Sequence, residues 1–247
     1  MTRCRDNVYS RASVADSSIK QDHVGIVIHT AAAKERRLNI LFVCTGNICR
    51  SAMAEAFLKE EIATANGYNG INVYSVGLQA EEGAPPHPEV LAVMREMGFD
   101  LSGHRARPLR EEDVDEADLI LAMAMHNSSR LLTAHQEAVD RVFTLKEFVI
   151  QGEKRGRELE EEDPEKRLQE LRGWIRRVEG LELEAGKGEL NEELRLFLLH
   201  YFHIYDHSFT IDDPLGQSMD FMRRTAHEIR EAVHKLAGAD LLALTGR

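Results

Sequence analysis

Short hydrophobic runs alternate with segments of helical spacing along most of the chain. Apolar residues fill 40–43, the segment I-N-V-Y-S at 71–75 alternates in polarity, and two further runs lie at 117–123 and 141–143. Between these runs, apolar positions three and four residues apart indicate amphipathic helices. Strands that alternate with helices predict an α/β fold with a parallel sheet flanked by helices on both faces.

Start and stop signals place the expected helices. Ser51 is expected to cap the first helix, which ends before Asn66. Pro88 is expected to open the second helix, and Gly98 to end it. A third helix is expected near 126–134. The last helix carries its apolar residues on one face, at Met219, Met222, Ala226, Ile229, Val233 and Leu236.

The pattern changes in residues 151–207. Helical spacing begins at Pro164, is interrupted by A-G-K-G-E at 185–189, and resumes with Leu194, Phe197, Leu198, Tyr201 and Tyr205. This pattern predicts an inserted antiparallel α-helical hairpin at 151–207. We therefore expect a sheet domain made of 38–150 and 208–247, and a disordered N-terminal extension at 1–37.

Composition excludes several classes of function. The formal net charge of -11 argues against a broad electrostatic surface for nucleic acid. Three cysteines are too few for a disulfide framework, which favours a reducing, cytoplasmic location. No apolar run reaches the roughly 18 residues of a membrane span, so no membrane partner is expected.

The segment V-C-T-G-N-I-C-R-S at 43–51 carries the strongest chemical signal. Gly46 is expected to allow a tight turn in which backbone N–H groups converge on an anion at a helix N-terminus. The helix dipole and Arg50 both favour a thiolate at Cys44, which makes it a candidate nucleophile. The planar guanidinium of Arg50 matches two oxygens of a phosphate, and Ser51 is placed to hydrogen-bond the thiolate.

A nucleophile that attacks a phosphate ester needs a proton donor for the departing oxygen. Asp213 is the candidate general acid, because it precedes Pro214 and a helix, a place that can lie at the carboxyl edge of a parallel sheet. Asp212 is the weaker candidate. Alone, Asp213 would also fit an ordinary Asp-Pro turn.

Several motifs together resemble the low-molecular-weight protein tyrosine phosphatase family. They are V-C-T-G-N-I-C-R-S, M-A-E-A at 53–56, Y-S-V-G at 74–77, H-R-A-R at 104–107 and D-D-P-L-G-Q-S at 212–218. The resemblance implies a four-stranded parallel sheet, hydrolysis of phosphotyrosine in phosphorylated proteins through a cysteinyl-phosphate intermediate, and neither a metal nor a cofactor.

The resemblance also implies roles for single residues. Cys44, Arg50 and Asp213 match the catalytic set, and a second cysteine in the loop implies a reversible disulfide between Cys49 and Cys44. Residues that match the phosphate-binding loop are Thr45, Gly46, Asn47, Ile48, Cys49 and Arg50. Residues that match the supporting hydrogen-bond network are Asn47, Ser51, Glu55, Ser75 and His104.

Departures from the family pattern leave alternatives open. Ala52 replaces the usual proline, and Leu215 replaces an aromatic residue that would stack on a tyrosine ring. The isoleucine at position 48 resembles the residue found in the tyrosine-directed members of the family. In the related protein arginine phosphatases, this loop position resembles threonine. The alternatives are the same chemistry on phosphoarginine or small phosphoesters, and a module that binds phosphate without hydrolysis. Arsenate reductases of this fold need further cysteines to relay electrons, and Cys4 is the only cysteine of this chain outside the loop.

The expected hairpin precedes Asp213 and is therefore predicted beside the entrance of the active site, as a lid, docking surface or dimer surface. Its histidines offer metal-ligand types, but aromatic neighbours favour packing, so no metal site is expected. These side chains are His200, His203, Asp206 and His207.

Overall fold

The computed structural model describes residues 37–64, 70–175 and 207–244. Four strands form one parallel sheet in the order β2-β1-β3-β4. The strands are β1 (Leu38–Cys44), β2 (Ile71–Gly77), β3 (Leu119–Ala122) and β4 (Val142–Thr144). The predicted fold class is confirmed.

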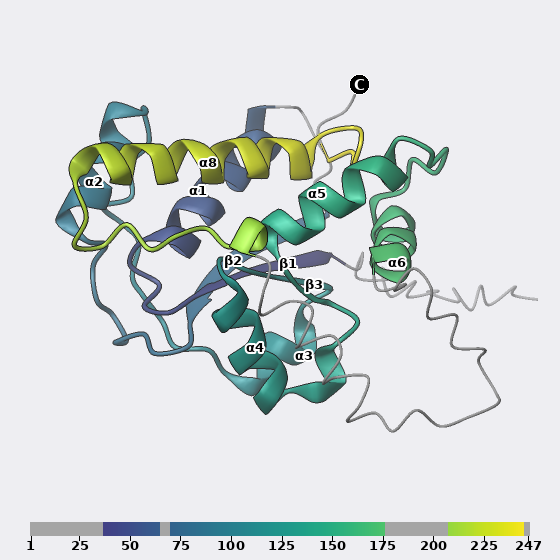
Figure 1. Cartoon of the computed structure of the whole chain (residues 1–247), viewed down its shortest axis with the longest axis horizontal. Coiled ribbons are helices and arrows are strands. Elements are labelled where there is room, and N and C mark those ends of the chain that lie inside the picture. Colours follow the sequence, from purple (N-terminus) through teal and green to yellow (C-terminus); the bar gives the residue numbers. More distant parts are fainter. Residues whose placement is uncertain (1–36, 65–69, 176–206, 245–247) are drawn as a thin grey trace, which may run out of the picture. The chain divides into compact units, whose positions relative to one another are not determined.

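Helices cover both faces of the sheet (Figure 1). One face lies under α1 (Arg50–Thr64), α5 (Leu145–Gly156) and α8 (Met219–Ala237), and the other carries α3 (Glu111–Glu116) and α4 (Met125–Ala134). The remaining elements are α2 (Pro88–Glu96), the 3-10 helix η1 (Gln136–Ala138), α6 (Pro164–Ile175) and the 3-10 helix η2 (His207–Phe209).

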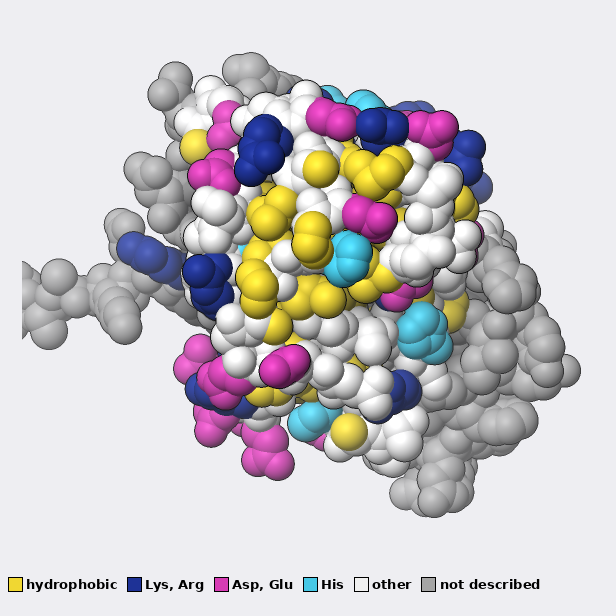
Figure 2. Space-filling model, turned by 90° about the vertical axis from the view of Figure 1, so that its left-hand side faces the viewer, with side chains coloured by type: hydrophobic (Ala, Val, Ile, Leu, Met, Phe, Trp, Pro, Cys, Tyr) yellow, Lys and Arg dark blue, Asp and Glu magenta, His cyan; other side chains and the backbone are white. Residues whose placement is uncertain are grey.

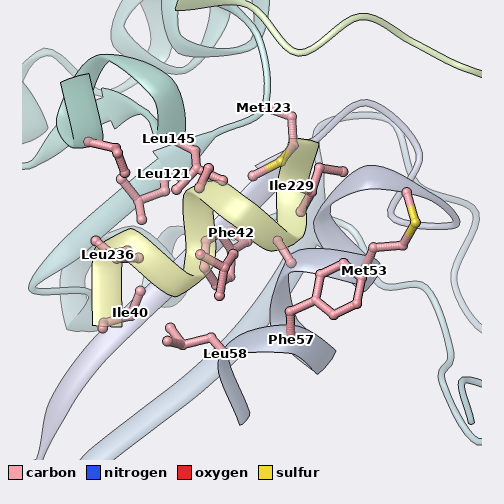
Figure 3. Close-up of a cluster of buried hydrophobic side chains, with 14 of the residues drawn as sticks. Ile40, Phe42, Met53, Phe57, Leu58, Leu121, Met123, Leu145, Ile229 and Leu236 are labelled. Atoms are coloured by element: carbon pink, nitrogen blue, oxygen red, sulfur yellow. The ribbon is translucent and has the colours of Figure 1, made fainter. Parts of the chain in front are cut away.

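Alternation along β1 divides the core between the two faces. Ile40 and Phe42 pack with α1 and α8, whereas Leu41 and Val43 pack with α3 and α4. Figure 3 shows the first cluster, in which Phe42 lies between residues of α1 and Ile229 of α8. Each such fully buried side chain stabilises the fold by about 1.5–3 kcal/mol. This rigid core fixes where β1 ends, and hence where Cys44 lies.

Most of the expected helix limits agree with the structure. Pro88 is the first residue of α2, and Gly98 follows its end with φ of 87°. The predicted face of α8 is buried, apart from Met219 at its start, which is partly buried. One expectation is wrong: Ser51 does not cap α1, because that helix already begins at Arg50 and the Ser51 hydroxyl contacts Cys44.

The region expected to be an inserted hairpin differs from its prediction. The expected boundary between residues 150 and 151 lies inside α5, which Thr144 and Glu147 cap reciprocally. Leu168, Leu171 and Ile175 of α6 belong to the same core as α5 and α8. The described part of 151–207 therefore completes the core of the sheet domain, and the second expected helix falls outside the described residues.

The first expected hairpin helix also does not lie beside the carboxyl edge of the sheet. The Arg172 guanidinium of α6 donates to the carbonyl oxygens of Asp118 (2.9 Å), directly before β3, and Asp140 (3.0 Å), two residues before β4. These are the amino ends of the strands. A lid formed by α6 is therefore ruled out, because its apolar residues are needed in the core at the opposite end.

Candidate active site

The 44–51 loop connects β1 to α1 at the carboxyl edge of the sheet, where the predicted nucleophile lies. Cys44 is 3% exposed, and its Sγ accepts a hydrogen bond from the backbone N–H of Asn47 (3.2 Å). Its Sγ also lies 3.0 Å from the Ser51 Oγ. Since the Asn47 side-chain Nδ2 donates to this Oγ, the Ser51 hydroxyl proton can point at the sulfur or at the Val76 carbonyl oxygen (3.4 Å), and the sulfur is the nearer of the two. Both contacts suit a thiolate.

Asn47 is the centre of the hydrogen-bond network that supports the loop. Its side-chain Nδ2 donates to Ser51 Oγ (3.0 Å) and Ser75 Oγ (2.8 Å), and Ser75 in turn donates to Glu55 Oε2 (2.5 Å). Its carbonyl oxygen accepts from His104 Nε2 (2.7 Å), which fixes the proton on that nitrogen. The structure thus brings together the supporting residues that the sequence predicted.

The sharp turn of the loop depends on Asn47 rather than on Gly46. Asn47 adopts a left-handed φ of 54°, whereas Gly46 is not among the described residues with positive φ. Gly77 is the glycine that the loop requires. A Cβ there would lie 2.7 Å from the Thr45 carbonyl oxygen and 2.9 Å from the Asn47 nitrogen. The Y-S-V-G motif therefore ends in glycine because the loop backbone passes directly over it.

Asn47→Ala is expected to lower kcat/KM by about 100-fold, since misplacing reacting groups by about 1 Å costs that much. The substitution removes the Nδ2 and Oδ1 contacts and leaves alanine at a left-handed φ. Steady-state kinetics on an aryl phosphate measures the effect. Asn72→Ala, at an exposed site of β2, is the matched control and should keep wild-type activity. Equal activities in the two variants would contradict the role of Asn47.

Arg50 joins the loop to the candidate general acid. One terminal nitrogen of its buried guanidinium donates to the Ile211 carbonyl oxygen (3.0 Å), and the other pairs with Asp213 Oδ2 (2.6 Å). The Arg50 side chain is 2% exposed and that of Asp213 46%. The other carboxylate oxygen of Asp213 accepts from the Leu215 N–H. Residues far apart in sequence thus meet, and the neighbouring Asp212 is exposed like Asp213.

The two loop cysteines lie in different environments. Burial, and next the nearby Cys44, raise the pKa of the Cys49 thiol well above its ordinary value. Cys49 is therefore a protonated thiol at neutral pH and a poor nucleophile, whereas Cys44 has two polar neighbours at its sulfur. Both cysteines are free thiols in the structure, and the disulfide between them stays a prediction.

Two residues of α4 near the loop were not predicted from sequence. Asn127 is fully buried and its Nδ2 donates to Thr45 Oγ1 (3.2 Å). His126 is exposed, and partial burial of its ring and the positive charge of Arg50 lower its pKa, so the imidazole is neutral at pH 7. A signal was present, because both residues shortly follow β3, whose carboxyl end lies next to that of β1.

Hydrophobic side chains gather in the middle of the face in Figure 2, with histidines among them and charged groups around them. Within the loop, Ile48 is partly exposed, as is Leu215 beyond Asp213. Partly exposed apolar side chains beside Cys44 and Arg50 suit a phosphate carried on a larger, partly apolar group.

The residues considered as metal ligands cannot be placed together. His200, His203 and Asp206 lie outside the described residues. In 37–64, 70–175 and 207–244, no group of three or more His, Cys, Asp or Glu side chains is arranged to hold a metal ion. No helix among those ranges is long and apolar enough to cross a membrane.

Comparisons with known proteins agree with this geometry. A family model described as low molecular weight phosphotyrosine protein phosphatase matches residues 39–195. The probable low molecular weight protein-tyrosine-phosphatase EpsP of Ralstonia solanacearum is 36% identical over 146 residues, which cover 58% of this chain and 97% of that relative. A protein-arginine-phosphatase of Bacillus subtilis is 41% identical over 112 residues, 45% of this chain and 73% of the relative.

A solved structure covers a larger share of the chain than the family model does. The low molecular weight protein tyrosine phosphatase of T. tengcongensis superposes with a TM-score of 0.54 and 30% identity, over 81% of this chain and 97% of that one. The family model spans more than half of the chain, and the loop geometry fits it. The chain therefore belongs to the low molecular weight phosphotyrosine protein phosphatase family, whose members are cysteine-dependent phosphatases.

Proposed function

We propose that this protein dephosphorylates proteins through a phosphocysteine intermediate on Cys44, with Arg50 as phosphate ligand and Asp213 as general acid. The observation that carries the proposal is the meeting of these three residues at one edge of the sheet. Thr45, Gly46, Asn47, Ile48 and Cys49 supply the backbone around the phosphate, as the family resemblance implies.

In the first step, the Cys44 thiolate attacks phosphorus and an S–P bond forms while the P–O bond to the leaving group breaks. Asp213 gives its proton to the departing oxygen. Arg50 and the N–H groups of the loop bind the equatorial oxygens, where charge develops in the transition state. The product of this step is the leaving alcohol or phenol, with the phosphoryl group held on sulfur.

In the second step, water attacks phosphorus and Asp213 accepts a proton from it. The S–P bond breaks, which releases inorganic phosphate and restores the thiolate of Cys44. A hydrogen bond from Ser51 to the sulfur, over 3.0 Å, stabilises the departing thiolate. The thiol of Cys49, with its raised pKa, does not compete as a nucleophile.

Phosphotyrosine is the proposed substrate group. Ile48 supports it, because its partly exposed apolar side chain lies in the phosphate-binding loop, where it would pack on an aromatic ring. Phosphoarginine is the second candidate, favoured by the similarity to proteins named protein-arginine-phosphatase and by the missing aromatic residue at Leu215. The guanidinium group of phosphoarginine would be bound more tightly by a hydroxyl acceptor than by an apolar side chain, so Ile48 supports phosphotyrosine as the first candidate.

Two peptides that differ only at the phosphorylated residue, one with phosphotyrosine and one with phosphoarginine, separate the two candidates. Wild-type protein is expected to have a kcat/KM at least about 10-fold higher on the phosphotyrosine peptide, and Ile48→Thr is expected to lower this ratio. The matched control is Ile150→Thr, at an isoleucine of α5 that is 47% exposed. That variant should keep the wild-type ratio.

Other outcomes of the peptide assay have clear readings. A preference for phosphoarginine would establish the second candidate. Phosphate binding without release from either peptide would instead indicate a non-catalytic phosphate-binding module. We further propose a cytoplasmic location, which the two free loop thiols support. A separate N-terminal extension at 1–37, and a docking or dimer surface in the part of 151–207 that lies outside the described residues, also stay proposals.

A further inference from the structure

The segment before Asp213 is tied to the end of β3 and to Arg50 by one buried residue. Ile211 is fully buried, its N–H donates to the Met123 carbonyl oxygen (2.9 Å), and its own carbonyl oxygen accepts from Arg50 (3.0 Å). The backbone at Ile211 therefore sets the position of the Arg50 guanidinium, and two residues later the chain presents the carboxyl group of Asp213.

Thr210 is held by two further elements. Its Oγ1 accepts from the Met125 N–H at the start of α4 (3.3 Å). Its carbonyl oxygen accepts from Lys146 Nζ at the start of α5 (3.3 Å), and the same Nζ pairs with Glu228 Oε1 of α8 (2.7 Å). Lys146 is 23% exposed, so this ammonium group is only partly solvated. It links α5, α8 and the segment that carries Asp213.

The side chain of Asp213 does not fix its own position. Its carboxylate is nearly half exposed, and its partners are the Arg50 guanidinium and the Leu215 N–H. Arg50 must also bind the phosphate in the proposed reaction, so a second means of holding Asp213 is required. The contacts of Thr210 with Met125 and Lys146, and that of the Ile211 N–H with Met123, lie within three residues of the carboxyl group and do not involve Arg50.

We propose that Lys146, oriented by Glu228, is a positioning residue that holds the Thr210 carbonyl group and thereby places Asp213 for proton transfer. The proposal rests on the proposed function, in which Asp213 is the general acid. Lys146 does not touch the substrate, and its effect is confined to the steps that use the proton of Asp213. A residue that only stabilised the fold would show no dependence on the leaving group.

Two substrates with different leaving groups test this assignment. The 4-nitrophenolate group leaves without much help from an acid, whereas the phenolate group of phenyl phosphate needs a proton. Lys146→Met is expected to lower kcat/KM on phenyl phosphate about 10-fold more than on 4-nitrophenyl phosphate. General acid catalysis contributes about 10²–10⁴-fold to the rate, and a misplaced Asp213 would lose part of that contribution. Asp213→Asn is the reference variant and should change this ratio further in the same direction.

Three more variants complete the experiment. Lys146→Arg keeps a donor to both partners and should restore most of the wild-type ratio. Lys235→Met is the matched control, since this lysine pairs only loosely with Glu231 of α8 (3.7 Å) in the described structure and should leave the ratio unchanged. Glu228→Gln removes the charge that orients Lys146 and should give a smaller shift, which decides the question if Lys146→Met does not fold.

If the ratio of kcat/KM on the two substrates were unchanged in Lys146→Met and in Glu228→Gln but strongly changed in Asp213→Asn, the role of Lys146 would be overturned. The proposed function would not be affected by that result. An equal shift in Lys235→Met would also overturn it. If wild-type protein released no phosphate, the proposed function itself would fail. If Asp213→Asn showed no dependence on the leaving group, the general acid would be wrong.

Discussion

Cys44→Ser is expected to abolish phosphatase turnover, with kcat reduced by about 10⁴-fold or more, because the remaining residues cannot replace the nucleophile. A serine hydroxyl is not ionised at neutral pH, and the loop holds no general base to activate it. The contacts of Cys44 with Asn47 and Ser51 are compatible with an oxygen in place of sulfur. The variant should therefore fold and still bind inorganic phosphate, which isothermal titration calorimetry can measure.

Cys49→Ser is the matched control, since both cysteines lie in the same loop and are equally buried, at 3% exposure each. Its thiol has a raised pKa and no role in the two proposed steps, so kcat/KM should stay within about 10-fold of wild type. Residual turnover in Cys44→Ser equal to that of Cys49→Ser would exclude Cys44 as the nucleophile.

Arg167→Met is expected to cause the largest loss of stability away from the active site. Arg167 is 3% exposed, and its guanidinium joins α6 to the end of α5 and to the chain after α8. It donates to the backbone carbonyl oxygens of Gly156 (3.0 Å), Leu159 (3.2 Å), Glu161 (2.7 Å), Ala239 (2.9 Å) and Leu241 (2.6 Å). Methionine fills similar volume but leaves these carbonyl groups without this donor.

The expected decrease in the free energy of unfolding is about 3–5 kcal/mol. Each buried carbonyl group left without its donor costs free energy, and the costs are not simply additive because all the carbonyl groups surround one side chain. Urea denaturation measures it as a lower midpoint with an unchanged m-value. Arg155→Met is the matched control, at a partly exposed arginine of α5 that pairs with Glu158 and Glu170, and should change stability by less than about 1 kcal/mol. Equal losses in both variants would contradict the account.

The geometry around Gly156 explains why α5 and α6 belong to the core. A Cβ at Gly156 would lie 1.5 Å from the Asp240 carbonyl oxygen, so the backbone after α8 passes directly against α5. That approach closes one end of the domain. It lies in the part of the chain that the sequence pattern assigned to a separate insertion.

The arrangement of the candidate active site could be predicted from the sequence because its parts are local or lie at strand ends. The 44–51 loop follows a strand that is easy to recognise, and the carboxyl ends of parallel strands lie at one edge of the sheet. To place Asp213 at this edge, one further inference was needed, namely that the last helix packs on the same sheet. The hydrogen bonds of Asn47 to Ser75 and His104 came from the family resemblance, since no spacing rule connects these positions.

The errors have physical causes as well. The amphipathic pattern of α6 shows that one face is buried but does not say against what, so an inserted hairpin and a core helix look alike. The capping pair Thr144 and Glu147 marked the start of α5 and would have moved the expected boundary. Lys146 carries no sequence signal, because an ion pair with a residue of α8 and a contact with one backbone carbonyl depend on tertiary structure.

The central claim is that the phosphoryl group passes through the sulfur of Cys44. In Asp213→Ala, loss of the group that activates water should slow the second step, so that an aryl phosphate with a good leaving group traps the intermediate. Rapid denaturation at alkaline pH, where an S–P bond is stable, followed by peptide mass spectrometry should find one phosphoryl group on the peptide that contains Cys44. Turnover with no phosphoryl group on that peptide, or with one on another residue, would contradict the account.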